Sequence, residues 1–253
     1  MPVQQNGSRL MLLAAALVLA GAPSARGAGL DRDTLLTDAP ATPDKGTVRV
    51  TGAGSGQSST DVGGVNQSSV SGSIMWSPFQ NFAADVGAFY QGTDGGPSAR
   101  VRYQILGQEK FGVDLAAGVR FKTVGFHPDR GEVEFLIAAG RKFGAIELVL
   151  NGVFGVETGG ANGKDIEAKA FAGYRFNDKI RAGVDSRFQT EIEDEGAVAK
   201  PPGAPRDFDL TAGPAVSWDV TRQLNLQALV GVFMPKKTNV TSPGGVIQLA
   251  FDF

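Results

Sequence analysis

Charged side chains recur at every second position along several segments, and they are the residues of this chain best placed to do chemistry. Arg and Lys stand beside Asp and Glu on the same alternating positions. Such a set has two possible roles: the two signs pair across neighbouring strands, or the cations line an aqueous wall and bias it toward anions. The predicted lumen-lining residues are Arg100, Arg102, Asp114, Arg120, Lys122, Glu132, Glu134, Glu147, Glu167, Arg175, Arg181, Asp185, Arg187, Asp207 and Asp209.

The sequence offers little for catalysis, metal binding or cofactor binding. His127 is the only histidine, no serine is placed beside it as a hydrolytic triad requires, and Pro128 and Asp129 are typical turn residues. One histidine and no cysteine make a metal site improbable on composition. The glycine-rich run 52–56 lacks the following helix of a nucleotide-binding turn. We therefore predict no catalytic, cofactor or metal site.

The charged residues lie on segments with a strict period of two, which places alternate side chains on opposite faces of a β-strand. In 208–220 the even positions are apolar and the odd positions from 207 to 219 are mainly polar. We predict about twelve strands, with about ten as the alternative if the first two do not complete the wall. The predicted ranges are 46–54, 65–76, 81–91, 98–107, 110–123, 131–142, 145–157, 164–176, 179–190, 206–219, 222–234 and 244–253.

Short and long connections between these segments alternate along the chain. The short ones are predicted at 77–80, 107–109, 143–144, 177–178 and 220–221. The long ones are predicted at 54–64, 92–97, 124–130, 158–163, 191–205 and 235–243. If both chain ends lie on one side, all short turns share that side and all long loops share the other, an asymmetry typical of outer-membrane barrels.

The polar face carries the charges together with many Gly and Ala, while the apolar face carries Val, Leu, Ile and Phe. A barrel of about twelve strands has a backbone radius on the order of 12 Å. Small apolar residues could not fill an interior of that width, so we predict that the charged face points inward. Aromatic residues form two predicted bands: Trp76, Phe111, Phe143, Tyr174, Phe176 and Trp218 near the short turns, and Tyr90, Phe121, Phe154, Phe188 and Phe233 near the long loops.

The last strand, 246–253, alternates strictly and ends on Phe251-Asp252-Phe253. This ending resembles the C-terminal signature of bacterial outer-membrane β-barrel proteins, and the resemblance extends over the chain from about residue 46. It implies an all-β fold, a closed antiparallel up-and-down transmembrane β-barrel, without indicating a subfamily. It also implies contact with outer-membrane lipid and recognition of Phe251 and Phe253 by the barrel assembly machinery.

The other end of the chain predicts export. Residues 1–28 have the features of a cleaved signal peptide, with Arg9 before an apolar run at 10–20 that is too short for a transmembrane helix. Residues 29–45 are predicted to be a periplasmic N-terminal lead-in, and 46–253 the barrel. A net charge of −2 argues against a nucleic-acid partner. The predicted location is the outer membrane of a Gram-negative bacterium.

The leading functional hypothesis is a non-enzymatic membrane protein, either a small pore or a structural barrel that displays its loops. A barrel enzyme that hydrolyses lipid or peptide is the second hypothesis, with His127 as its one specific candidate. An adhesin or binding protein that uses the acidic and proline-rich loop 191–205 is the third. The sequence leaves the solute, the open or closed state of the lumen and the oligomeric state undetermined.

Overall fold

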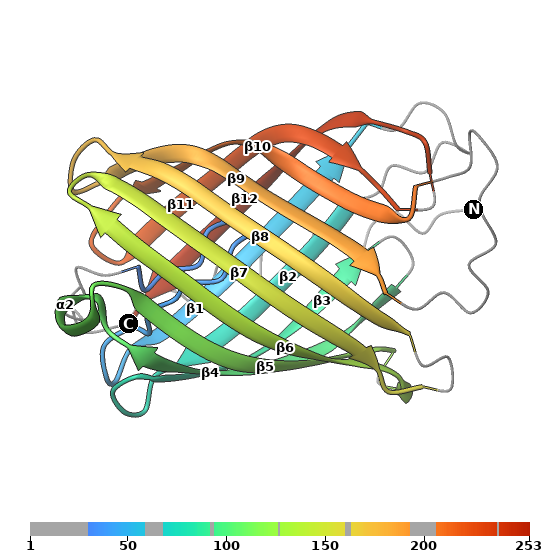
Figure 1. Ribbon diagram of the computed structural model, residues 1–253, viewed down its shortest axis with the longest axis horizontal. Helices are drawn as coiled ribbons and strands as arrows, with labels where there is room; N and C mark the ends of the chain where they lie inside the picture. Colours follow the sequence, from blue (N-terminus) through green and yellow to red (C-terminus); the bar gives the residue numbers. More distant parts are fainter. Residues whose placement is uncertain are drawn as a thin grey trace.

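Twelve antiparallel strands form a closed barrel in which each strand pairs with its sequence neighbours and the first pairs with the last (Figure 1). The computed structural model describes residues 30–58, 68–91, 94–125, 127–159, 163–192, 206–236 and 238–253. The predicted fold class is confirmed. The alternative of about ten strands is wrong, because the first two strands complete the wall.

The strands are β1 (Val48–Gln57), β2 (Ser68–Trp76), β3 (Phe82–Gln91), β4 (Asp94–Leu106), β5 (Asp114–Val124), β6 (His127–Phe143), β7 (Ile146–Glu157), β8 (Lys164–Arg175), β9 (Ile180–Glu191), β10 (Phe208–Asp219), β11 (Leu224–Met234) and β12 (Ser242–Asp252). The described residues also include a short helix, α2 (Gln108–Phe111). No helix in these described ranges is long and apolar enough to cross a membrane. The predicted signal peptide and most of the loop 191–205 lie outside the described residues.

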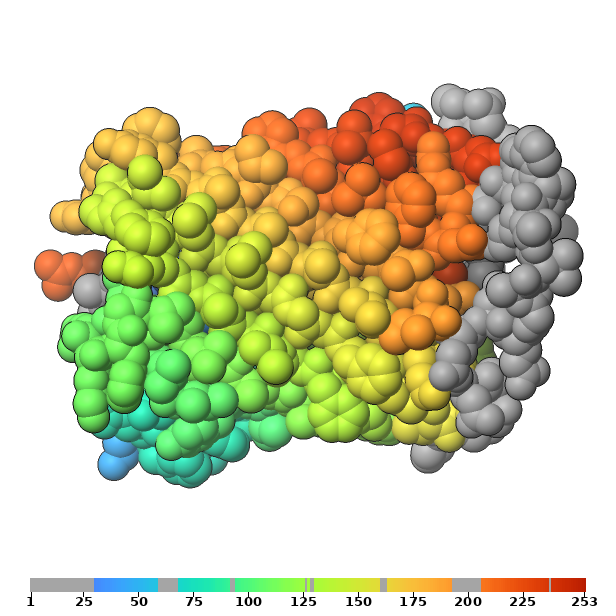
Figure 2. All heavy atoms as spheres, in the orientation of Figure 1, coloured from blue at the N-terminus to red at the C-terminus, as the bar shows by residue number. Residues whose placement is uncertain are grey.

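The apolar face of the sheet points outward. On β12, Ile247 and Leu249 are 59% and 50% exposed, whereas Val246 and Ala250, on either side of this stretch, are 8% and 2% exposed. The same alternation holds on β7, where every second residue is buried. Figure 2 shows one side of the resulting cylinder, formed largely by the middle strands of the chain. An outer surface of this kind needs lipid around it, because water does not favour so large an apolar area.

All five short connections lie at one end, together with the C-terminus and the start of β1, and we call it the short-turn end (Figure 1). The opposite end is the loop end. Trp76, Tyr174 and Trp218 are exposed on the outer face near the short-turn end, and Tyr90 is exposed near the loop end. Phe233 departs from the predicted aromatic band, because it pairs with the inward-facing Thr211 and therefore faces the lumen.

Two predicted loops are mostly strand. β4 begins at Asp94 and β6 at His127, so that much of the predicted loops 92–97 and 124–130 belongs to paired hairpins. These hairpin ends lie beyond the apolar alternation, and hydrogen-bond pairing there no longer requires an apolar outer face. Conversely, α2 takes up the start of the predicted strand 110–123. It ends at Gly112, whose φ of 75° is a left-handed conformation that suits glycine at a helix C-terminus.

We expect a charge on the outer face to destabilise the barrel far more than the same charge on the inner face. Ile247→Arg places a guanidinium near the middle of β12 facing lipid, which costs about 2–4 kcal/mol at the bilayer midplane. The matched control is Gln248→Arg, whose side chain faces the cavity and should cost less than ~1 kcal/mol. Denaturant unfolding from lipid vesicles measures both, and equal losses would contradict the assigned faces.

Candidate pore and the N-terminal segment

Residues 30–47, which we call the N-terminal segment, enter the barrel from the short-turn end and cross its lumen (Figure 1). The backbone N–H of Leu36 donates to Oδ2 of Asp185 on β9 at 3.0 Å. Gln227 on β11 donates to the backbone oxygen of Asp33 at 3.0 Å, and Arg100 on β4 contacts the Asp33 carboxylate. Contacts to strands so far apart around the wall mean that the segment spans the interior.

The segment is packed as tightly as a protein core. Leu30 is 2% exposed and forms an apolar cluster with Val149 and Phe171, two inward-facing wall residues. Gly140 on β6 faces the segment so closely that a methyl group there would lie 2.6 Å from Cγ of Pro40. The glycine is therefore needed here, because a side chain would collide with the side chains of Pro40 and Leu30. The lead-in predicted from sequence did not indicate this insertion.

Asp38 is the most heavily bonded residue of the segment. Its carboxylate accepts from Lys169 at 2.8 Å and from Arg120 at 3.1 Å, and it also pairs with Arg100. Its backbone is fixed as well, because the side chain of Asn151 accepts from its N–H at 2.7 Å and donates to its carbonyl oxygen at 2.9 Å. Three cations from three strands thus converge on one carboxylate.

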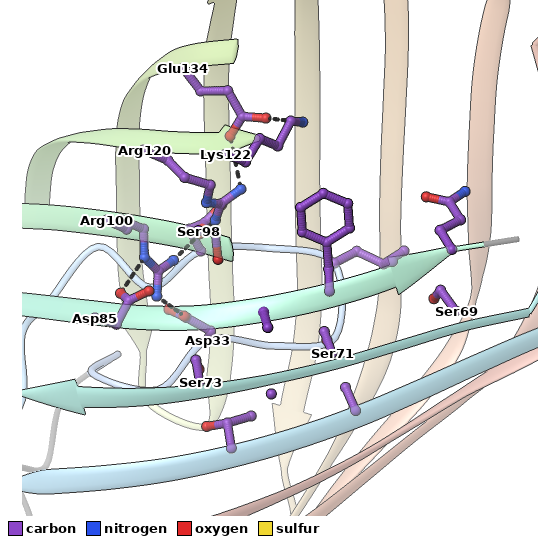
Figure 3. Close-up of a pocket in the computed structure, with 18 of the residues that line it drawn as sticks. Asp33, Ser69, Ser71, Ser73, Asp85, Ser98, Arg100, Arg120, Lys122 and Glu134 are labelled. Carbon is purple, nitrogen blue, oxygen red and sulfur yellow. Dashed lines mark hydrogen bonds and ion pairs between the residues drawn. The ribbon is translucent and has the colours of Figure 1, made fainter. Parts of the chain in front are cut away.

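Asp33 provides a second carboxylate for the same group of cations. Arg100 and Arg102 each donate to it at 2.8 Å. In the described residues, Asp33 forms ion pairs with these two arginines alone. Arg102 forms its ion pair with Asp33 alone. The Nε atom of Arg102 is buried without a hydrogen-bond partner. Figure 3 shows Asp33 beside Arg100 and Asp85 at the floor of the cavity.

The charges of these partners keep both segment carboxylates ionised. Burial alone would raise the pKa of Asp38, but Lys169, Arg120 and Arg100 together lower it below the ordinary value for Asp. The pKa of Asp33 is likewise lowered, against burial, by Arg100 and Arg102. A depressed carboxyl pKa stabilises the folded arrangement above the ordinary pKa, and this stabilisation is lost only as the pH falls through the lowered value.

From this floor, ion pairs continue along the wall toward the loop end (Figure 3). Lys122 lies between Glu134 at 2.6 Å and Glu132 at 2.9 Å, and Arg120 also reaches Glu134 at 2.9 Å. Lys169 contacts Glu167 at 3.4 Å, and the same carboxylate pairs with Arg187. Linked through Asp38, these charges of β4, β5, β6, β8 and β9 therefore form one connected series.

A second set of ion pairs lies toward the short-turn end. Glu147, 1% exposed, binds Arg175 at 2.8 Å and Arg181 at 3.2 Å. Asp252 on the last strand binds Arg49 on the first at 2.6 Å, so that an ion pair spans the junction that closes the barrel. These buried charges need such partners, because an isolated ion in this setting is strongly disfavoured.

On the loop side of the segment lies a cavity of about 1470 Å³. One part of its wall carries the charged series described above. Apart from Arg49 on β1, the part formed by β12, β1 and β2 borders the cavity with uncharged side chains, among them the polar Gln248, Thr51, Ser71 and Ser73. Figure 3 shows the two serines on β2. The cavity is thus asymmetric, with ions on one side and hydroxyl and amide groups on the other.

Most residues predicted to line the lumen share the inward face. Of these, Arg100, Arg102, Arg120, Lys122, Glu132, Glu134, Glu167 and Arg187 border the cavity. Asp114, Glu147, Arg175, Arg181 and Asp185 face inward elsewhere, and Asp209 pairs with Arg187 at 3.8 Å. Asp207 differs, because it lies before β10 and is exposed. Most of these side chains have an oppositely charged partner among the described residues, whereas Asp114 accepts a hydrogen bond from Gln104 and Asp185 accepts one from Thr37.

Sequence reasoning missed several residues of this network. Lys169 follows the same alternation as Glu167 and could have been included. Asp33 and Asp38 stand in a segment without periodicity. Only the acidic residues of this segment, compared with the cations predicted for the wall, could have indicated their role. His127 is exposed at the start of β6, and no described side chain makes a hydrogen bond to it. No group of three acidic or histidine residues able to hold a metal ion occurs in the described part.

Comparisons with solved structures identify barrels of the same kind. The NanC porin superposes with a TM-score of 0.59 at 10% identity, covering 80% of this chain and 98% of that one. The KdgM porin gives a TM-score of 0.57 at 9% identity over 81% and 99%. The COG4313 outer membrane channel from Pseudomonas putida F1 gives 0.54 at 12% identity over 84% and 97%. At these identities the likeness shows the fold.

The comparison with curated protein sequences gives no match. A protein-family model described as "Putative MetA-pathway of phenol degradation" matches residues 24–244, which is most of the chain. The closed twelve-strand barrel of the described residues, with apolar side chains outward, has the fold of these solved neighbours. The chain therefore belongs to the family described as the putative MetA pathway of phenol degradation.

Proposed function

We propose that this protein is a non-enzymatic outer-membrane channel for small polar solutes, with the N-terminal segment as its constriction. The observation that carries the proposal is the charged cavity of about 1470 Å³ between the loop end and the segment. An interior lined by ions and hydroxyl groups stays wetted, which passage of hydrophilic solutes requires. The names of the structural neighbours, two porins and an outer membrane channel, support the same function.

The orientation and biogenesis follow from the same proposal. We place the short-turn end in the periplasm and the long loops outside the cell, as is usual for such barrels. Residues 1–28 would then be a cleaved signal peptide, and 30–47 would enter the lumen from the periplasmic side. Insertion into the membrane would use the barrel assembly machinery, which would read Phe251 and Phe253 at the end of β12. The rings of these two residues meet edge to face at 4.8 Å.

Removing the segment should open the channel. We expect deletion of residues 30–44 to raise single-channel conductance in planar bilayers several-fold, because the chain that crosses the lumen is gone while every strand remains. The heat-modifiable migration of the variant in a detergent gel serves as the control for a folded barrel. A folded deletion variant with the same conductance as the full chain would contradict the constriction, and electrical silence of both would overturn the channel.

The segment should be held in place chiefly by its carboxylates. The chain has no cysteine, so that Ala39→Cys, at a position 2% exposed, introduces a single buried thiol. We expect slow labelling by a water-soluble maleimide, and at least tenfold faster labelling after Asp38→Asn, because breaking a buried ion pair costs about 3–5 kcal/mol.

Ser71→Cys, which faces the cavity, is the control for this labelling experiment. The thiol at position 71 should react readily with or without Asp38→Asn, because it faces the cavity and is not covered by the N-terminal segment. If Asp38→Asn leaves the labelling rate at position 39 unchanged, the ion pairs of Asp38 do not hold the segment.

A further inference from the structure

The cations beneath the cavity have more positive charge than the barrel wall neutralises. Arg100, Arg102, Arg120 and Lys169 come from β4, β5 and β8 and all contact carboxylates of the N-terminal segment. On the wall, these four cations face three carboxylates within ion-pair distance, those of Asp85, Glu134 and Glu167. Without the segment one positive charge would have no partner.

Arg102 shows this most clearly. It is 3% exposed, and among the described residues its ion-pair partner is Asp33 of the segment. With the segment removed, Arg102 would face the lumen without a carboxylate partner. Its Nε atom already lacks a hydrogen-bond partner. This guanidinium would then be available to an anion that enters the cavity.

The geometry points to an anion-binding site. We propose that Arg100, Arg102, Arg120 and Lys169 form a site for small organic carboxylates, which Asp33 and Asp38 occupy as an internal ligand. All six of these residues border the cavity. A solute that enters from the loop end thus reaches the same cations that hold the segment, and the two compete.

The chemistry of the site favours a carboxylate, and a dicarboxylate most. Guanidinium groups bind carboxylates through paired, directed N–H bonds, and the two segment carboxylates lie close enough for Arg100 to contact both. The hydroxyl groups of Ser71 and Ser73 on β2 border the same cavity. They can bind the polar remainder of a solute.

If a free carboxylate competes with the N-terminal segment, its affinity for the site depends on whether the segment is present. A tethered ligand acts at a high effective concentration, so that a free carboxylate binds weakly to the full chain. The inference rests on the proposed function for its biological meaning, but binding to the site is measurable without any conductance.

The test uses succinate as a dicarboxylate probe and succinamide as its uncharged match, at constant ionic strength and with purified barrel in detergent. We expect the calorimetric Kd for succinate to be at least tenfold lower for the 30–44 deletion than for the full chain, with no binding of succinamide. The double variant Asp33→Asn/Asp38→Asn should give the same gain in affinity, which separates lost charge from lost chain.

Arg102→Gln in the deletion background should weaken succinate binding at least tenfold. Arg175→Gln is the matched control, because Arg175 pairs with Glu147 at the short-turn end and should leave the affinity unchanged. In the full chain carrying Ala39→Cys, succinate should speed maleimide labelling, and succinamide should not.

Equal Kd values for the deletion variant and the full chain, or equal effects of Arg102→Gln and Arg175→Gln, would overturn the site even if the barrel conducts. Succinate binding with the expected dependence in a barrel that never conducts would support the site and contradict the channel. The two proposals therefore fail through different measurements.

Discussion

A charge inside a membrane barrel must find an opposite charge, and in this protein part of that opposite charge comes from outside the wall. Asp38 accepts from cations on β4, β5 and β8, and Asp33 is the acidic partner that Arg102 contacts. Losing one member of a buried pair costs far more than the pair itself contributes. The position of the N-terminal segment and the arrangement of the inner wall therefore depend on each other.

The same constraint explains why the two ends of the lumen differ. Toward the short-turn end, Glu147 is enclosed by Arg175 and Arg181, and the segment fills the remaining space with Leu30 against Val149 and Phe171. Toward the loop end, the ions pair along one side, and β12, β1 and β2 border the cavity mainly with small or uncharged polar side chains. Apolar packing contributes little to this interior, because the apolar faces of the strands are turned to lipid.

The strand pattern was predictable because lipid on one side and water on the other impose a period of two on every membrane-crossing strand. That rule gave the twelve strands, the facing of Ile247 and Leu249, and the charged inner surface. The prediction fails where the chain leaves the apolar zone of the membrane. β4 and β6 extend past the apolar zone, α2 precedes β5, and Phe233 faces inward near the loop end.

The insertion of the N-terminal segment was not predictable for a different reason. Its residues follow no period, since their partners lie on several strands: Leu36 and Thr37 meet Asp185 on β9, and Asp38 meets Asn151 on β7. Contacts of this kind depend on three-dimensional placement and leave no local pattern. The one available signal would have been a count of positive and negative side chains on the predicted inner face. Near Arg102 the wall cations outnumber the acids beside them.

In the proposed channel, a segment held by ion pairs would close the lumen in a way that an apolar one could not. An apolar plug needs an apolar seat, and the seat would shed water once the plug left, so that the channel would remain a barrier to hydrophilic solutes. Cations such as Arg100 and Lys169 bind a carboxylate when it is present and water when it is absent. Both states are then compatible with a polar lumen, and the balance between them is set by competition among anions. The excess of positive charge at the cavity floor is what makes this exchange possible.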